Sequence, residues 1–395
     1  MSKNNLAFTI EDEERLNEIK EGYQKLLPFG IRKFLRKTFI FRFARCYFVA
    51  KEKTFYPGMP RKCFVRRYFD NVLWAIKYKR VNTTYNRYGL DIKNFRKASD
   101  YLEIHSKSID QIKEHHKGHP MAEYREENVA IRYSILADHK HLFYSYMESI
   151  MPGSVPKTNL VFQGDMVIAP VDKTKNLEQS LLSLPDGKYI CKPALGSQGN
   201  LIFSITKKGK NLKFSDKEIN IERIVEESKD SPFLVQEFLS QHKELNKFNG
   251  ETVNTLRIVS TRWNEETHIL AGMIRISAKK DQVVDNASAG GTFVGIDIEN
   301  GTLREYGYFY DQTKTTHHPV SNIKYEGFKI PYWKETIELI KTLHPIIFGF
   351  AAIGWDIAIT PDGPVIVEIN QRFSVKGLQI CNGGLRKKWE EFKEK

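Results

Sequence analysis

The sequence WDIAITPDGPVIVEIN, residues 355–370, indicates the fold more clearly than any other stretch of the chain. Two apolar runs flank the turn PDGP, which predicts a β-hairpin. Side chains alternate between the two faces of a strand, so Glu368 and Asn370 share one face. The same alternation directs Val367 and Ile369 toward the core.

Asp356 lies on the first strand of this hairpin, and the crossing of the two strands brings it beside Glu368 and Asn370. Two carboxylates and an amide on one face are hard ligands suited to Mg²⁺ with bound phosphates and water. The alternative is the solvated face of an ordinary hairpin. Acidic residues that interrupt an otherwise apolar strand favour the metal site.

A second polar signal lies in KYICKPALGSQGNLIFSIT, residues 188–206, where a strand ends at Lys192 and a small-residue loop follows. Gly196 and Gly199 let backbone N–H groups approach a phosphate, and the lysine would neutralise its charge. The loop does not open a helix, so it is not a Walker A loop. An ordinary hairpin is the alternative. Cys191 points away from Lys192 by alternation and is expected in the core.

Two further signals are weaker. Arg257 interrupts the apolar strand TLRIVSTRW, and a buried arginine is costly unless it meets an anion. A phosphate, a carboxylate ligand or a structural ion pair with a nearby glutamate would each satisfy it. Gly290 and Gly291 follow Asn286, which indicates either backbone packed against a ligand or a simple turn.

The composition bounds the class of protein. The 395 residues are enough for two or three domains, and no apolar run approaches the length of a membrane span. The acidic, polar start does not resemble a signal peptide. Four widely spaced cysteines form neither a disulfide framework nor a zinc motif. We therefore expect a cytoplasmic, reduced protein.

The charge is concentrated in residues 31–80, which hold 15 Lys and Arg residues against Glu52 and Asp70. This window carries the whole net charge of +13, together with 13 aromatic residues. Three readings stay open. The window is a helical domain with solvated cations, a surface for an anionic membrane or acidic acceptor, or, least expected, a nucleic-acid surface.

The order of these motifs resembles the ATP-grasp enzymes. It runs from Lys140 in ADHKHLF through Lys192-Pro193, the strand FLVQEFL, the arginine strand and Asn-x₃-Gly-Gly to Asp-x₁₁-Glu-x-Asn. The phrases VNTLRIVS, GFKIPYW and GWDIAITPDGPVIVEIN resemble more narrowly the sugar-transfer-associated ATP-grasp family, which is related to α-L-glutamate ligases. The resemblance covers roughly residues 130–380.

The resemblance implies an α+β protein in which two lobes grip ATP. The helical spacing of apolar residues and the excess of Lys and Arg, not the resemblance, predict a basic, mainly helical N-terminal module before it. We expect this module at residues 1–125. The first lobe, with the phosphate loop, would cover residues 126–240, and the second lobe, with the metal site, residues 241–395.

The resemblance also assigns the nucleotide site. Lys140 and Lys192 would contact the ATP phosphates. The loop that closes over them would comprise Gly196, Ser197, Gln198 and Gly199. Main-chain groups for adenine would come from the hinge strand Gln236, Glu237, Phe238 and Leu239. Glu244 is the candidate for the ribose, in competition with His242.

Asp356, Glu368 and Asn370 match the metal-binding positions of the family, and Arg257 matches the arginine that steadies the transferring phosphoryl group. The remaining substrate contacts would come from Arg275, Asn286, Gly290, Gly291 and Arg372. Two departures concern the acceptor. Gly354 stands where many of these ligases have an arginine, and the chain reads Gln371-Arg372-Phe373-Ser374 where others have a Pro-Gly loop.

The resemblance implies an ATP- and Mg²⁺-dependent carboxylate–amine ligase that forms an amide through an acyl phosphate. Its substrates would be an amino acid and a sugar or sugar acid, in the biosynthesis of a surface polysaccharide such as a capsule or O-antigen. The alternatives are a phosphotransferase that acts on a sugar hydroxyl and a non-catalytic membrane- or glycan-binding protein. We expect a cytoplasmic protein, with peripheral contact to an anionic membrane or lipid-linked acceptor through residues 31–80.

Overall fold

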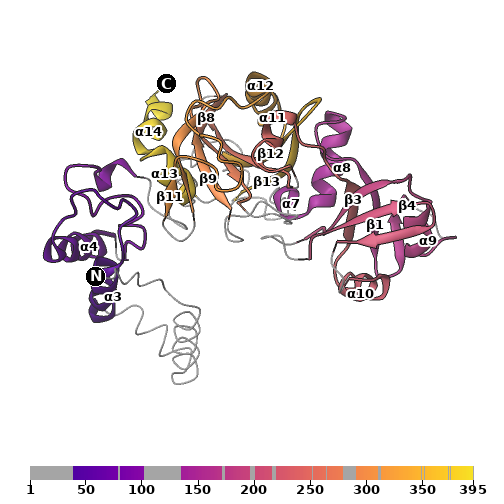
Figure 1. Ribbon diagram of the computed structural model, residues 1–395, viewed down its shortest axis with the longest axis horizontal. Coiled ribbons are helices and arrows are strands. Elements are labelled where there is room, and N and C mark those ends of the chain that lie inside the picture. Colours follow the sequence, from indigo (N-terminus) through magenta and orange to yellow (C-terminus); the bar gives the residue numbers. More distant parts are fainter. Residues whose placement is uncertain are drawn as a thin grey trace, which may run out of the picture. The chain divides into compact units, whose positions relative to one another are not determined.

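A computed structural model shows how the chain is built (Figure 1). It describes residues 39–78, 81–101, 135–170, 174–195, 201–215, 219–250, 252–263, 265–278, 291–309, 313–347, 349–350, 352–371, 373 and 375–394. The chain divides into two compact units, the N-terminal unit Met1–Arg96 and the C-terminal unit Lys97–Lys395. The domain boundary expected at residue 125 lies outside the described residues, and the boundary at 240 stays a prediction.

The N-terminal unit is built on two helices, α3 (Phe39–Lys51) and α4 (Phe64–Tyr78). They confirm the helices expected there, although residues 31–38 lie outside the described part of the chain. The buried core between the helices is small and consists of Cys46, Val72 and Ala75. Irregular structure then continues to Arg96.

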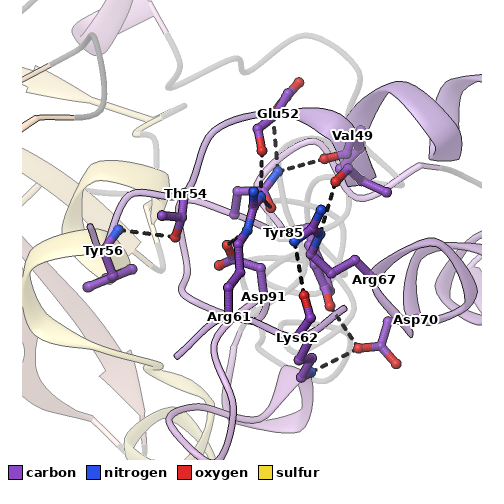
Figure 2. A network of polar contacts seen from close by, with 12 residues as sticks. Val49, Glu52, Thr54, Tyr56, Arg61, Lys62, Arg67, Asp70, Tyr85 and Asp91 are labelled. Carbon is purple, nitrogen blue, oxygen red and sulfur yellow. Dashed lines mark hydrogen bonds and ion pairs between the residues drawn. The ribbon is translucent and has the colours of Figure 1, made fainter. Parts of the chain in front are cut away.

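Polar contacts supply much of the order in the N-terminal unit (Figure 2). Arg61 forms an ion pair with the buried Asp91 at 2.7 Å. Arg67 donates to a carbonyl in the last turn of α3, and the Tyr85 hydroxyl donates to Asp70 at 2.7 Å. Part of the positive charge of residues 31–80 is therefore structural, because it holds loops onto the helices.

The C-terminal unit contains two antiparallel sheets, which confirms the α+β class. The first has six strands in the order β2-β1-β6-β3-β4-β5. These are β1 (Thr158–Gln163), β2 (Met166–Ala169), β3 (Gly187–Pro193), β4 (Phe203–Lys208), β5 (Asn211–Phe214) and β6 (Phe233–Glu237). Helices α9 (Leu177–Ser183) and α10 (Ile221–Glu227) supply residues to its core, in which Cys191 is fully buried as expected.

The second sheet has seven strands in the order β11-β10-β9-β8-β7-β12-β13. These are β7 (Thr255–Trp263), β8 (Glu266–Ile276), β9 (Thr292–Ile296), β10 (Leu303–Tyr308), β11 (Lys314–Thr315), β12 (Ala352–Thr360) and β13 (Gly363–Asn370). The helices beside it are α11 (Lys243–Asn246), α12 (Trp333–Leu343), α13 (Val375–Asn382) and α14 (Arg386–Glu394). None of the helices within the described residues is long and apolar enough to span a membrane.

Two helices, α7 (Ile135–Asp138) and α8 (Lys140–Ile150), are separated at His139. His139 forms a β-bridge with Leu195, and the Lys140 N–H donates to the Ala194 carbonyl at 2.8 Å. The His139 side chain caps α8. These contacts tie the start of α8 to the end of β3. In Figure 1, α8 lies between the two sheets.

The β12–β13 hairpin corrects one expectation about the core. Asp356 pairs with Glu368, whereas the next residue of β12 pairs with Ile366, so Val367 lies in a β-bulge. Ile366 and Ile369 are buried, and Val367 is only half-buried. The prediction that Val367 faces the core is therefore wrong, because one extra residue shifts the alternation.

Candidate functional site

The three residues predicted to bind a metal lie together on the β12–β13 hairpin. Asp356 is directly opposite Glu368 in the strand register. The Asn370 amide donates to a Glu368 carboxylate oxygen at 3.2 Å and to an Asp356 oxygen at 3.4 Å. Asp356 is 3% exposed, which rules out the solvated hairpin face as its environment.

Two arginines reach Asp356 from neighbouring strands. Arg257, directly opposite on β7, pairs with both carboxylate oxygens through Nε and Nη2. Arg275, on β8, lies 3.0 Å from Asp356 Oδ2 and donates to Thr255 Oγ1 at 2.6 Å. Of the partners left open for Arg257, the structure shows a carboxylate, and it belongs to Asp356 rather than to a glutamate. Arg275, predicted as a substrate contact, belongs to the same cluster.

The pKa values of Asp356 and Glu368 shift in opposite directions in this environment. Burial opposes ionisation of Asp356, but Arg257 and Arg275 more than offset it and hold the pKa of Asp356 well below its usual value. Burial, followed by the negative charge of Asp356, raises the pKa of Glu368, and Lys140 acts in the opposite direction. Glu368 is the carboxylate that a cation would stabilise most.

This donor set fits a hard cation such as Mg²⁺, because it offers two carboxylates and an amide in mutual contact. Among the described residues, no cluster of three or more His, Cys, Asp or Glu side chains could hold a metal ion. A site at the hairpin would therefore depend on the Asn370 amide and on oxygens from phosphate or water.

Lys192 faces the hairpin from the other sheet. Its side chain is buried on β3, and its ammonium group donates to the Tyr144 hydroxyl at 2.7 Å. The same group lies 4.9 Å from the centre of the Tyr144 ring. Burial, followed by the charge of Lys140, lowers the pKa of Lys192 to about 7, with Glu368 opposing. Lys192 thus has a neutral hydrogen-bond partner.

Tyr144 is the site residue that sequence reasoning missed. It is buried on α8, and its hydroxyl donates to the Val367 carbonyl on β13 while it accepts from Lys192 on β3. Tyr144 therefore joins the two sheets at the site. The available signal was its spacing, because Tyr144 follows Lys140 by four residues and shares its face of α8.

Several predicted residues lie outside the described structure. They are Gly196, Ser197, Gln198, Gly199, Asn286, Gly290 and Arg372. Gly291 is described and is buried at the start of β9. Ala194 and Leu195, which lead into the predicted phosphate loop, are held against the start of α8.

The predicted hinge strand connects the two sheets. Gln236 is fully buried on β6 and donates from its amide to Thr158 Oγ1 at 2.9 Å. The N–H groups of Glu237 and Phe238 donate to carbonyls of the six-stranded sheet region. Six residues beyond Gln236, the His242 N–H donates to the Ile359 carbonyl on β12. Among the described residues, no backbone partner is found for the N–H of Leu239, and its contact with adenine stays a prediction.

The two ribose candidates differ in how they are engaged. The His242 ring accepts from the Glu244 N–H and caps α11. The Glu244 carboxylate pairs with Lys247 at 2.6 Å, and this contact lowers its pKa. Both candidates thus have partners within or beside α11, and the ribose contact stays a prediction.

The structure explains why a glycine stands at position 354. A Cβ at this position would lie 2.6 Å from the Cβ of Phe373, which packs over the strand. No side chain fits there without movement of Phe373. The guanidinium groups near Asp356 come instead from Arg257 and Arg275 on the neighbouring strands.

Comparison with known families gives one match. The family described as sugar-transfer associated ATP-grasp matches residues 121–394. No curated protein sequence matches the chain at a significant level.

Solved structures with a similar chain path are ligases of low sequence identity. D-alanyl-alanine synthetase A of Vibrio cholerae is 12% identical, with a TM-score of 0.39 over 66% of this chain and 64% of that one. D-alanine-D-alanine ligase of Helicobacter pylori is 12% identical, with a TM-score of 0.36 over 66% and 58%. L-amino acid ligase of Bacillus licheniformis is 8% identical, with a TM-score of 0.36 over 71% and 57%. The match spans less than two thirds of each of these proteins.

Proposed function

The chain belongs to the sugar-transfer-associated ATP-grasp family, and we propose that it is an ATP-dependent carboxylate–amine ligase. One observation carries the proposal. A buried lysine with a neutral partner, Lys192, faces a carboxylate pair, Asp356 and Glu368, across Tyr144. This arrangement suits a ligand that carries both phosphate groups and a divalent cation.

We propose that the ATP phosphates lie beside Lys192 and Lys140. The lowered pKa of Lys192 supports this, because a nearby anion would restore the charge that burial disfavours. Asp356, Glu368 and Asn370 would hold Mg²⁺, which neutralises phosphate charge when bound. Adenine would contact the hinge at Glu237 and Leu239, and the ribose would contact Glu244.

Arg257 and Arg275 keep Asp356 ionised and oriented. Because the pair with Asp356 uses Nε and Nη2 of Arg257, its Nη1 is the atom that would meet a phosphoryl oxygen. In this role Arg257 would steady the transferring phosphoryl group while it holds the carboxylate.

The proposed reaction has two steps. A substrate carboxylate attacks the γ-phosphorus of ATP, which gives an acyl phosphate and ADP. An amine then attacks the acyl carbon, the C–O bond to phosphate breaks, and the amine loses a proton, giving an amide and inorganic phosphate. The protein supplies positioning and charge neutralisation and needs no side-chain nucleophile.

The substrates we propose are an amino acid and a sugar or sugar acid, in the synthesis of a surface polysaccharide such as a capsule. The sugar-transfer association of the family supports this choice. Use of ATP supports a cytoplasmic location. The exposed cations of the N-terminal unit support an acceptor that is acidic or linked to lipid.

The test is thermal melting with ATP and Mg²⁺ against ATP and EDTA, followed by an ADP-release screen of amino acids with sugar acids. We expect metal-dependent stabilisation, and expect Glu368→Gln to abolish it. Glu326→Gln, a change at an exposed pair with Lys324, should keep it. Equal stabilisation of the Glu368 variant would contradict the metal assignment. ADP release with a sugar and no amine would identify a phosphotransferase instead.

A further inference from the structure

The outer face of α4 in the N-terminal unit is apolar and exposed. Val65, Phe69, Leu73 and Ile76 are 59, 54, 62 and 49% exposed, respectively. At about 100° per residue these four side chains fall within an arc of about 80°. Of the α4 residues in the small core, Ala75 lies on another side of the helix, and Val72 borders the exposed arc. We name these four residues the α4 face.

The α4 face continues onto α3 through a row of aromatic rings. Phe69 lies beside Tyr68, with ring centres 5.8 Å apart, and Tyr68 stacks on Phe64. Phe64 meets Tyr47 edge to face at 5.4 Å, and Tyr47 meets Phe48 at 5.7 Å. Phe48 is 66% exposed. The apolar surface therefore extends across both helices.

Cations accompany this apolar surface. Arg45 and Lys51 are exposed on α3, and Arg66 and Lys77 are exposed on α4. The two helices contain one acidic residue, Asp70, whose carboxylate is engaged by Lys62, Arg66 and Tyr85. The surface therefore combines exposed apolar side chains with an excess of positive charge.

We propose that the N-terminal unit docks on a lipid bilayer with anionic headgroups, with the α4 face at the acyl boundary and the cations at the phosphates. Apolar insertion and attraction to anionic lipid are the two forces that hold interfacial helices on membranes. Three of the four residues of the α4 face, Val65, Leu73 and Ile76, are aliphatic, and exposed aliphatic side chains suit the acyl region of a bilayer better than they suit nucleic-acid bases, which stack on rings. Protein interfaces, in contrast, are depleted in lysine.

This proposal goes beyond the ligase reaction and does not depend on it. Docking would hold the C-terminal unit close to substrates attached to lipid. The nucleotide site lies on other elements of the chain, so vesicle binding and ATP binding are separate measurements.

The test is co-sedimentation of the full chain with vesicles of equal parts phosphatidylcholine and phosphatidylglycerol, and with phosphatidylcholine vesicles. We expect strong partitioning only to the anionic vesicles. Phe69→Gln with Leu73→Gln should weaken it at least about tenfold. The matched control, Met166→Gln with Val320→Gln, alters two exposed apolar residues of the C-terminal unit and should bind as the wild type.

A second set of measurements tests the contribution of the positive charges. Arg45→Gln and Lys77→Gln should each weaken partitioning about fivefold, and added salt should do the same. All of these variants should keep the stabilisation by ATP and Mg²⁺ that the wild type shows.

Three outcomes would overturn the proposal. The first is equal vesicle binding by the Phe69/Leu73 variant and its control. The second is a wild type that does not bind vesicles together with a lower melting temperature in the variant, which would show that the α4 face packs against the chain itself. The third is concentration-dependent self-association lost in the variant, which would assign the face to a second copy.

Discussion

The two sheets that border the candidate site differ in the partners of their buried charged side chains. On the seven-stranded sheet, the buried carboxylate of Asp356 is paired with Arg257 and Arg275. On the six-stranded sheet, the buried ammonium group of Lys192 donates to the neutral hydroxyl of Tyr144. Correspondingly, the pKa of Asp356 moves in favour of its charged form, and the pKa of Lys192 moves against its charged form.

The difference separates a buried charge that has its counter-ions within the fold from a buried charge that donates to a neutral group. A paired buried carboxylate already has its counter-ions, so the loss of one of them leaves a buried charge that is only partly compensated. A buried lysine whose hydrogen-bond partner is a neutral hydroxyl costs free energy that a nearby anion would reduce. Buried groups with a strongly perturbed pKa are common at functional sites. The lysine side is thus where substrate charge would be felt most.

The largest expected effect comes from removing the counter-ion on the paired side. Arg257→Met leaves Asp356 buried with Arg275 as its remaining cation, so we expect the free energy of unfolding to fall by about 3 kcal/mol. Urea denaturation measures the change. Arg223→Met, at an exposed ion pair with Glu227, is the control and should cost less than about 1 kcal/mol. Equal stability of the two variants would show that the buried ion pair of Arg257 matters no more to the fold than the exposed pair of Arg223.

Replacing the buried cation of the six-stranded sheet with methionine should not lower the free energy of unfolding. Lys192→Met removes a buried ammonium group, so the free energy of unfolding should stay unchanged or rise. The affinity for ATP with Mg²⁺ should fall at least about tenfold, because a charge-assisted contact is lost. Calorimetric titration measures the affinity. Lys213→Met, an exposed change on β5, should alter neither quantity. A Lys192 variant that unfolds readily but still binds ATP would show that this lysine serves the fold and not the nucleotide.

The sequence predicts the contacts that lie close along the chain. Asp356 and Glu368 flank one short turn, so alternation and hairpin geometry are enough to bring them together. The bulge at Val367 is not predictable in this way, since it depends on packing around the hairpin. The general pattern of strands and the α+β class follow from apolar runs separated by turn residues.

Contacts between distant segments could not be predicted from spacing. Arg257 meets Asp356 because β7 pairs with β12, 99 residues later, and sequence alone left its partner open. Tyr144 reaches Val367 across 223 residues. Gly354 looks like a missing arginine in the sequence, whereas the fold shows that Phe373 occupies the space. Strand pairing and packing between elements that lie far apart in the sequence determine these contacts.

The pH dependence of nucleotide affinity provides a finer test of the lysine side. Lys192 has a pKa of about 7, below its ordinary value because of burial and the charge of Lys140. ATP phosphates would raise that pKa, so binding should take up a proton above about pH 7. Affinity should therefore fall as pH rises above 7, by up to about tenfold per pH unit, and level off below it. Titrations between pH 7 and 9 measure the slope. Lys192→Met should lack it, and a slope that persists in this variant would assign the proton to another group.

The smallest expected effect concerns the tyrosine that joins the two sides. Tyr144→Phe removes both the acceptor for Lys192 and the hydrogen bond to the Val367 carbonyl, so unfolding should become easier by about 1 kcal/mol. Tyr146→Phe is a matched control, because this neighbouring tyrosine of α8 donates to the Ile346 carbonyl at 2.9 Å. Both variants should lose similar stability in urea, but only Tyr144→Phe should change the affinity for ATP. The direction of that change reports the role of the hydroxyl. If the hydroxyl holds Lys192 in place for the phosphates, affinity falls. If it competes with the phosphates for the ammonium group, affinity rises. No change in affinity would make Tyr144 a structural link between the sheets, and the lysine would then be positioned by β3 alone.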